Sequence, residues 1–191
     1  YTISLRKKIF RHMLHRKLKT EELNRISAEQ FKEAQKSGLV IMLDNVRSLH
    51  NIGAVFRTAD AYRADCIYLC GICATPPNAE IHKTALGAEL SVDYKYFKNS
   101  IDAVNDLKAN GYKIIAIEQT ENSVSLENFE IKKGEKYAVI LGHEVKGVQQ
   151  EIVDAADYAI ELPQFGTKHS LNVSVTAGIV IWEFAKHLIM K

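Results

Sequence analysis

The feature that most constrains the fold is a series of short apolar runs separated by segments with helical periodicity. The runs are five or six residues long and almost continuously apolar, which is typical of strands buried on both faces of a sheet. We predict strands at LVIML (39–43), CIYLC (66–70), YKIIAI (112–117), YAVIL (137–141) and YAIEL (158–162), with VDYKYF (92–97) as a sixth. Helical patterns cover 51–62, 78–88, 100–109, 147–155 and 170–190. This alternation predicts an α/β fold with a mostly parallel sheet and helices on both faces.

The helix expected at 51–62 directly follows a strand and a polar loop, DNVRSLH. Asn51 is predicted to cap its N-terminus, and Arg57 lies off the apolar stripe of the helix. Both residues should therefore lie near the carboxyl edge of the sheet, where open α/β sheets bind their ligands.

The helix expected at 170–190 has an apolar body and a polar start. Ser170 is predicted to be its N-cap, and close packing against another backbone would explain Gly178 inside it. A wide buried face is predicted, which could serve a dimer interface as well as a core; its members are Leu171, Val175, Gly178, Ile179, Trp182, Ala185 and Leu188.

The net charge of +2 is unevenly distributed along the chain. Residues 1–38 carry ten Lys or Arg against four Glu, and the first twenty residues contain seven basic side chains and no acidic one. We predict that 1–38 is a basic helical N-terminal extension, ending near Gly38, and that 39–191 is the main domain. A basic run of this kind can attract a polyanion such as RNA, although a solvated helical face gives the same pattern.

Several functional classes are disfavoured by composition. No apolar stretch approaches the roughly 20 residues that cross a bilayer, and no signal peptide opens the chain, so we expect a cytoplasmic protein without a membrane partner. The three cysteines, Cys66, Cys70 and Cys73, have no second cluster to complete a zinc site, so we expect buried thiols and no metal.

The usual nucleotide and nucleophile motifs are also missing. The sequence has no phosphate-binding G-x-x-x-x-G-K-[ST], no dinucleotide G-x-G-x-x-G after the first strand and no G-x-S-x-G nucleophile elbow. In their place LGHEVKG (141–147) follows the strand YAVIL. Gly142 and Gly147 permit close backbone approach or unusual torsions, and Glu144 is expected beside a helix start at 147 or 148. Alone, this stretch could equally be a plain strand-to-helix turn.

Three stretches in order, DNVRSLHNIGAVFRTADAY (44–62), VILGHEVKGV (139–148) and LPQFGTKHSLNVSVTAGIVIWEF (162–184), resemble the three motifs of the SpoU, or TrmH-like, class of the SPOUT superfamily. Proteins of that class transfer a methyl group from S-adenosylmethionine to a ribose 2′-hydroxyl of tRNA or rRNA. The resemblance covers about residues 39–190. It implies a deep trefoil knot in the C-terminal part of the sheet, a topology that ordinary connection rules disfavour. It also implies a homodimer with the active site built across the interface.

The resemblance assigns roles to individual residues. Arg57 corresponds to the arginine central to catalysis, and Asn51 to the asparagine of the first motif. Glu144 corresponds to the acidic residue of the second motif, and Ser170 and Asn172 to the polar pair of the third. The cofactor-binding contacts correspond to Gly142, Leu162 and Leu171. Because a free arginine has a pKa above about 12, Arg57 is expected to orient the substrate rather than act as a base.

The chain departs from the class at His143, Lys146, Lys168 and His169, which add positive or titratable character near the expected site. These departures leave the corresponding catalytic residues intact, so they concern the choice of RNA substrate. Between the two RNA classes we expect tRNA, because the chain is compact. An RNA-binding protein with a degenerate cofactor site is the alternative function. A structural Arg57–Glu144 salt bridge without catalysis is the alternative for the site, and a base methyltransferase is a third alternative.

Overall fold

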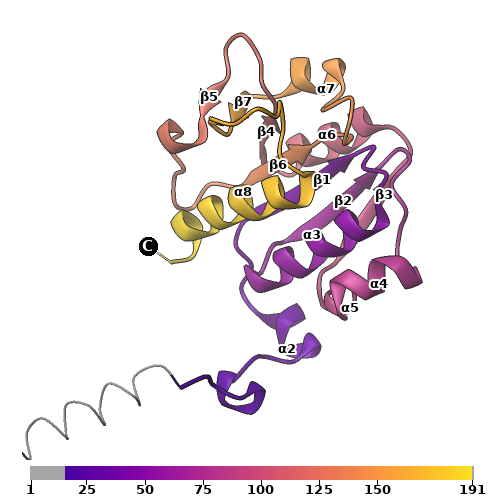
Figure 1. Ribbon diagram of the computed structural model, residues 1–191, viewed down its shortest axis with the longest axis vertical. Coiled ribbons are helices and arrows are strands. Elements are labelled where there is room, and N and C mark those ends of the chain that lie inside the picture. Colours follow the sequence, from indigo (N-terminus) through magenta and orange to yellow (C-terminus); the bar gives the residue numbers. More distant parts are fainter. Residues whose placement is uncertain (1–15, 191) are drawn as a thin grey trace, which may run out of the picture.

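The computed structural model describes residues 16–190 and contains a parallel sheet between two layers of helices (Figure 1). Within these residues the sheet has seven strands in the order β3-β2-β1-β6-β4-β7-β5, and every pairing is parallel. The strands are β1 (Leu39–Asp44), β2 (Cys66–Cys70), β3 (Tyr94–Phe97), β4 (Lys113–Ile117), β5 (Val124–Ser125), β6 (Tyr137–Leu141) and β7 (Tyr158–Glu161). All six predicted strands and the parallel α/β fold are confirmed, and only the two-residue β5 was not predicted.

Each face of the sheet has its own apolar core. Along β1, Leu39, Ile41 and Leu43 pack on one side, whereas Val40 and Met42 pack on the other. The first side is covered by α2 (Ala28–Glu33), α3 (Leu49–Ala61), α4 (Ala79–Ala85), α5 (Ala88–Ser91) and α8 (Val173–Leu188), and the second by α6 (Ser100–Ala109) and α7 (Gln150–Ala155). Figure 1 shows α3 and α8 lying next to each other in front of the sheet. Helices on both faces explain why the central strands are apolar on both sides.

The starts of α3 and α8 differ from the prediction. Ser48 caps α3 by accepting a hydrogen bond from the backbone N–H of Asn51 (3.3 Å), so the prediction that Asn51 is the cap is wrong. Asn172 caps α8 by accepting from the backbone N–H of Ser174 (2.9 Å), so the prediction that Ser170 is the cap is also wrong. Each segment offers two suitable polar residues close together, and tertiary contacts select between them.

The buried face of α8 also differs from the prediction. Its core-facing residues are Val173, Ala177, Val180, Ile181, Phe184, Ala185 and Leu188, of which only the last two were predicted. Val175, Ile179 and Trp182 are 51%, 42% and 43% exposed. A Cβ added to Gly178 would meet no atom within 4 Å, so close packing does not explain this glycine within one chain. The helix is apolar on most of its circumference, and periodicity therefore could not choose the inner face.

Other boundaries shift by a few residues. The helix expected at 78–88 is divided into α4 and α5 because Leu86 and Gly87 adopt left-handed backbone conformations (φ 53° and 92°). The helix expected at 147–155 begins at Gln150. Two short 3₁₀ helices, η1 (Thr20–Leu23) and η2 (Leu126–Asn128), complete the described part of the chain.

The N-terminal segment is only partly described. Within 16–38 the structure has η1 and α2, and α2 ends at Glu33 rather than near Gly38. The rest of the predicted N-terminal helix lies outside the described residues. No helix within 16–190 is long and apolar enough to cross a membrane.

Candidate active site

A cavity of about 790 Å³ lies at the carboxyl edge of β4, β6 and β7. The three loops that follow these strands line it, together with the start of α8. Six of the predicted site residues are among the lining residues: Gly142, Glu144, Leu162, Ser170, Leu171 and Asn172. The volume falls within the range of pockets that bind ligands of cofactor size. The placement agrees with the prediction that ligands bind at this edge of the sheet.

The loop after β6 owes its shape to two glycines. A Cβ on Gly142 would lie 2.1 Å from the carbonyl carbon of Gly147, so only glycine allows this approach of two backbone segments. Gly147 has a φ of +69°, in the left-handed region, and exchanges backbone hydrogen bonds with His143 (2.9 and 3.0 Å). Both roles predicted for these glycines are confirmed.

Two acidic residues that the sequence analysis missed fix the same loop to the sheet. Asp44 is fully buried at the end of β1 and accepts hydrogen bonds from the backbone N–H (2.9 Å) and side chain (2.7 Å) of Gln149. Glu118, just after β4, accepts from the backbone N–H of Val148 (2.9 Å). A carboxylate at the end of an apolar strand is a signal that could have identified both residues.

Glu144 joins the loop after β6 to the start of α3. Its carboxylate accepts hydrogen bonds from the backbone N–H groups of Arg47 (3.1 Å) and Ser48 (2.9 Å) and from Nδ2 of Asn51 (3.1 Å). Burial alone would raise the pKa of Glu144, but these donors outweigh it and the pKa lies below its usual value. Glu144 was expected beside the helix that follows its own loop, and it instead contacts a helix almost a hundred residues earlier in the chain.

Asn51 extends this contact to the third motif. Nδ2 of Asn172 donates to Oδ1 of Asn51 (3.2 Å), so Glu144, Asn51 and Asn172 form a continuous chain of hydrogen bonds whose two end members line the cavity. The Asn172 side chain also caps α8 through Ser174, which fixes its orientation. Ser170 is exposed on the preceding loop and lines the cavity.

Arg57 lies apart from these residues. It is exposed on α3 and is not among the residues lining the cavity. Within residues 16–190 no hydrogen bond or ion pair joins its side chain to Glu144, whose donors are Arg47, Ser48 and Asn51. The alternative of a structural Arg57–Glu144 salt bridge is therefore wrong for the single chain.

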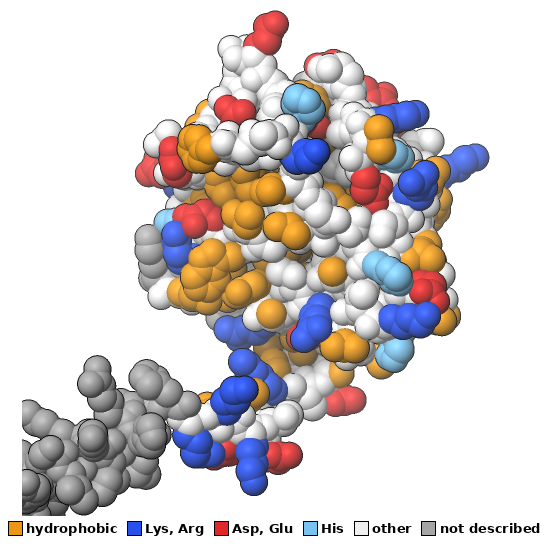
Figure 2. Space-filling model, viewed as in Figure 1, with side chains coloured by type: hydrophobic (Ala, Val, Ile, Leu, Met, Phe, Trp, Pro, Cys, Tyr) orange, Lys and Arg blue, Asp and Glu red, His pale blue; other side chains and the backbone are white. Residues whose placement is uncertain are grey.

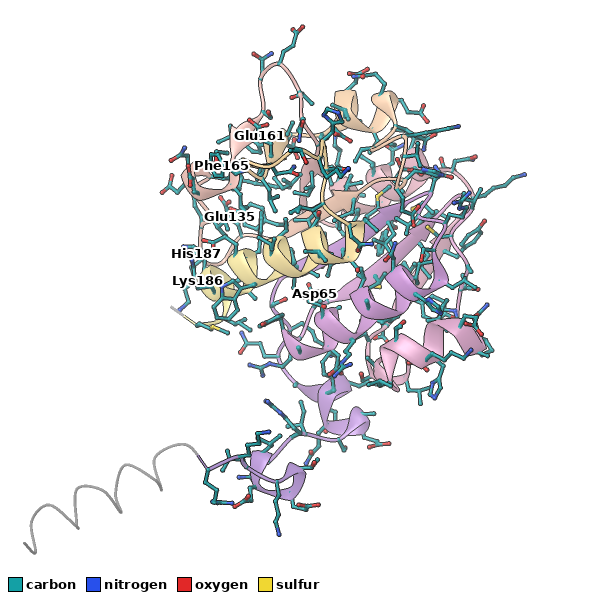
Figure 3. The ribbon with its side chains drawn as sticks, viewed as in Figure 1. Asp65, Glu135, Glu161, Phe165, Lys186 and His187 are labelled. Carbon is teal, nitrogen blue, oxygen red and sulfur yellow. The ribbon has the colours of Figure 1, made fainter. Side chains whose placement is uncertain are left out.

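The residues that depart from the class surround the cavity. His143, Lys146 and His169 line it, and the backbone carbonyl of His169 accepts from Nε2 of Gln119 (3.2 Å). Lys168 is exposed on the same loop. Phe165, also on this loop beyond Glu161 of β7, is 98% exposed (Figure 3). The loop between β7 and α8 thus presents basic and aromatic side chains to solvent.

The cysteines are buried or half-buried thiols, as expected. Burial raises the pKa of Cys66 to about 12 and that of Cys73 to about 11. Cys73 donates a weak hydrogen bond to the carbonyl of Leu43 (3.3 Å). These thiols stay protonated at neutral pH, which argues against thiolate chemistry.

Comparison with known proteins identifies the family. The profile of the SpoU rRNA Methylase family matches residues 38–182, which is most of the described chain. The chain belongs to the SpoU rRNA methylase family. This SpoU methylase is 32% identical over 152 residues to the tRNA (guanosine(18)-2′-O)-methyltransferase of Aquifex aeolicus, an alignment covering 79% of the chain and 70% of the relative. It is 31% identical over 153 residues to the 23S rRNA (guanosine-2′-O-)-methyltransferase of Neisseria meningitidis, covering 80% of the chain and 60% of that relative.

Solved structures agree with the assignment. An AdoMet-bound rRNA methyltransferase from Sinorhizobium meliloti superimposes with a TM-score of 0.75 and 27% identity, covering 83% of this chain and 60% of that one. The A. aeolicus TrmH/SpoU tRNA-modifying enzyme superimposes with a TM-score of 0.72 and 30% identity, covering 84% and 79%. The SpoU methylase is thus an S-adenosylmethionine-dependent RNA methyltransferase. The predicted enzyme class and cofactor are confirmed.

Proposed function

We propose that this SpoU methylase methylates the ribose 2′-hydroxyl of a structured RNA, with tRNA favoured over rRNA. The observation that carries the proposal is the hydrogen-bonded chain Glu144–Asn51–Asn172, which joins all three motifs beside one cavity that Glu144 and Asn172 line. The names of the Aquifex and Neisseria relatives both specify 2′-O-methylation, of tRNA and 23S rRNA respectively. The preference for tRNA is carried over from the sequence analysis, and the two relatives, one named for each RNA, do not decide it.

The cavity is proposed as the S-adenosylmethionine site, with Gly142, Leu162 and Leu171 as its cofactor-binding residues. The absence of a side chain at Gly142 lets the two ends of its loop meet, and the two leucines supply apolar walls. S-adenosylmethionine supplies a methyl group that its sulfonium already activates. We also propose that the chain around this cavity forms the trefoil knot of the class, since the loops after β4, β6 and β7 converge there.

A homodimer is the proposed assembly. Val175, Ile179 and Trp182 form an exposed apolar stripe along α8, and the ring of Trp182 contacts Tyr62 at the end of α3 (centroids 5.6 Å apart). Figure 2 shows hydrophobic side chains gathered over the part of the surface where α8 lies. Exposed apolar patches of this kind mark protein interfaces. A second copy on this face would place residues of one protomer near the cavity of its partner.

Such a dimer accounts for the position of Arg57. The proposal is that Arg57 of one protomer serves the cavity of its partner and orients the target phosphate or hydroxyl there. A guanidinium suits this task because it is always charged and donates in a planar fork. Asn172 and Ser170 would hold the ribose, while Glu144, already engaged by three donors, positions Asn51 and the start of α3. The chemistry is then mainly alignment of the hydroxyl with the methyl group.

The basic segment 1–38 is proposed to bind RNA outside the methyltransferase domain at 39–191. Its ten Lys or Arg residues provide the charge for phosphate contacts. Lys146, Lys168 and His169 add positive or titratable groups beside the cavity itself. Phosphate contacts at both places would position the RNA without specifying its sequence.

The test is methyl transfer from labelled S-adenosylmethionine to purified tRNA and rRNA, followed by alkaline hydrolysis. A 2′-O-methyl group blocks cleavage at its nucleotide, so the expected label lies in alkali-resistant dinucleotides from tRNA. Label released in mononucleotides would indicate base methylation and overturn the proposal for ribose. Calorimetric titration with S-adenosylmethionine provides the second measurement, because a folded protein that does not bind it would support the alternative of an RNA-binding protein.

A further inference from the structure

An exposed aromatic side chain lies beside the proposed cofactor cavity. Phe165, on the loop between β7 and α8, is 98% exposed, more than any other large apolar side chain in residues 16–190 (Figure 3). Gln164 and His169 of the same loop line the cavity, and so does Val145 of the loop after β6, which is 83% exposed. No aromatic pair within the described residues includes Phe165. Its ring is therefore open to a flat ligand that approaches the cavity.

The loop that carries Phe165 is anchored on both sides of this residue. The preceding strand β7 is paired with β4 and with β5. After Phe165, the backbone carbonyl of His169 accepts a hydrogen bond from Nε2 of Gln119 (3.2 Å), and the side chain of Asn172 caps α8. Anchoring limits the conformational entropy that the loop loses when it binds a ligand.

Three cations surround the same opening. Arg47 lies on the loop after β1, Lys146 on the loop after β6 and Lys168 on the loop after β7, and all three are exposed. The backbone of Arg47 binds the lining residue Glu144, and Lys146 itself lines the cavity. Within residues 16–190 none of the three cationic side chains forms an ion pair. Together with Phe165 they form the cavity rim, in which the cations are available for phosphates.

The carboxylates of the cavity are placed differently from these cations. Glu118 and Glu144 are half-buried and accept hydrogen bonds from backbone N–H groups of the neighbouring loops. Glu161, at the end of β7, is also half-buried, and the stretch 163–169 that follows it contains no acidic residue. An anion that approaches from solvent therefore meets the exposed cations of the rim before it meets a carboxylate.

A projecting aromatic ring beside unpaired cations suits single-stranded nucleic acid, because a base stacks on the ring while the cations hold the backbone. In a duplex the bases are covered by their stacked neighbours, and A-form RNA is contacted through its 2′-hydroxyls and phosphates instead. RNA is also the substrate of this enzyme class. The three cations therefore favour RNA over a protein partner as the occupant of the rim.

We propose that the cavity rim binds the RNA substrate in single-stranded form: Phe165 stacks on one unpaired base, and the three cations contact the phosphates next to it. The inference rests on the proposed function, since the RNA is held over the same cavity. It also narrows the substrate class, because the methylated ribose then belongs to a loop or another unpaired stretch of the RNA. Stacking tolerates every base, so the rim selects an unpaired nucleotide without reading its identity.

The test uses the whole protein and a short oligo(U) strand with a central 5-iodouridine, a base that photocrosslinks to an aromatic ring stacked on it. Mass spectrometry should find the crosslink at Phe165. Phe165→Leu, which keeps an apolar side chain without a ring, should lose the crosslink and bind the single strand about tenfold more weakly. Its affinity for the oligo(U)·oligo(A) duplex should stay within about twofold, and Phe165→Tyr should behave as the wild type. Tyr96→Leu is the matched control, since Tyr96 is an exposed aromatic residue on β3, at the other edge of the sheet.

Lys168→Gln tests the phosphate contacts. It should weaken binding of the single strand and make the slope of log affinity against log salt shallower by about 0.7, the effect of one phosphate contact on a single strand. Lys98→Gln, at an exposed position after β3, removes the same charge outside the rim and should leave both quantities unchanged. An unchanged slope in Lys168→Gln would remove this cation from the proposal.

Unchanged single-strand affinity of Phe165→Leu, or an equal loss for the duplex, would overturn the proposal. A change of Phe165→Leu from dimer to monomer in sedimentation equilibrium would also overturn it and assign Phe165 to contact with a second copy of the chain. Methyl transfer by the wild type is measured in parallel. A wild type that methylates RNA but does not crosslink through Phe165 contradicts this inference alone, whereas one that crosslinks there but transfers no methyl group contradicts the proposed function alone.

Discussion

Glu144 and Asn51 lie 93 positions apart in the sequence, and the carboxylate of one accepts a 3.1 Å hydrogen bond from the side-chain amide of the other. The same carboxylate binds two backbone N–H groups that precede α3. This contact is the physical link between the first two motifs, since it ties the loop that lines the cavity to the helix that carries Arg57.

Glu144→Gln is expected to lower the free energy of unfolding by about 1–3 kcal/mol, because the amide cannot accept from all three donors and turns an N–H toward one of them. The loss should be measured by urea denaturation at neutral pH. Glu151→Gln, at an exposed position on α7, is the control and should have little effect.

The pH dependence of this difference follows from the lowered pKa of Glu144. A carboxyl group whose pKa is lower in the folded than in the unfolded state stabilises the protein above the unfolded-state pKa, near 4.5, and loses that contribution as the pH falls through the folded-state pKa. The difference between wild type and Glu144→Gln should therefore be largest at neutral pH and shrink as the pH falls below about 4.5. A difference that grows toward acid would contradict the assigned contacts.

Arg57→Ala should reduce methyl transfer by about 100-fold or more, the usual effect of removing a group that acts in the transition state. Its affinity for S-adenosylmethionine, measured by calorimetry, should remain within about twofold, because Arg57 is proposed to contact the RNA rather than the cofactor. Lys108→Ala, at an exposed position on α6, is the control for loss of positive charge. Full activity of Arg57→Ala would refute its catalytic role.

Mixed dimers test whether Arg57 acts in the partner. An Arg57→Ala protomer and an Asn172→Ala protomer should each be inactive alone. If the site is shared, their mixture should regain activity, because one of its two cavities then combines Arg57 from one protomer with Asn172 from the other. No recovery in a mixture that forms heterodimers would place the whole site within one protomer.

Ile179→Asp should convert the proposed dimer to a monomer, because it places a charge in the apolar stripe of α8. Sedimentation equilibrium gives the mass directly. Leu86→Asp is the control, since Leu86 is 63% exposed at the end of α4, outside the stripe. A monomeric wild type would remove the basis for both this prediction and the shared site.

Substitution by alanine should be harmful at one glycine, Gly142, and stabilising at another, Gly178. Gly142→Ala forces a Cβ to within 2.1 Å of backbone atoms of Gly147 and Val148, so the loop must shift and affinity for S-adenosylmethionine should fall at least about tenfold. Gly178→Ala meets no atom within 4 Å and should stabilise α8 in a monomer by up to about 1 kcal/mol. Weaker dimerisation of Gly178→Ala would show instead that the partner packs against this position.

Deletion of residues 1–20 removes seven basic side chains and no acidic one. RNA binding should weaken, and the slope of log affinity against log salt should become shallower by about 0.7–0.9 for each phosphate that the segment neutralises. Filter binding over a range of salt concentrations measures both quantities. A slope equal to that of the full chain would mean that the segment does not bind phosphates.

Much of the fold could be predicted from local pattern. Strands buried on both faces are short and continuously apolar, and this signal located β1, β2, β4, β6 and β7 within a few residues. Helix starts were less accurate, since Ser48 and Asn51, or Ser170 and Asn172, are equally good caps by type. The inner face of α8 was predicted wrongly because Val175 and Ile179 are as apolar as the residues that face the core.

The sequence by itself determined the parallel α/β architecture, the glycines of the loop after β6 and the identity of the polar residues at the motifs, because these depend on residue type and spacing. Only the tertiary structure decided that Glu144 contacts the start of α3, that Asp44 and Glu118 hold the loop after β6, and that Arg57 lies outside the cavity of its own chain. Hydrogen bonds between residues distant in sequence depend on where the sheet brings strand ends together, and no local pattern contains that information.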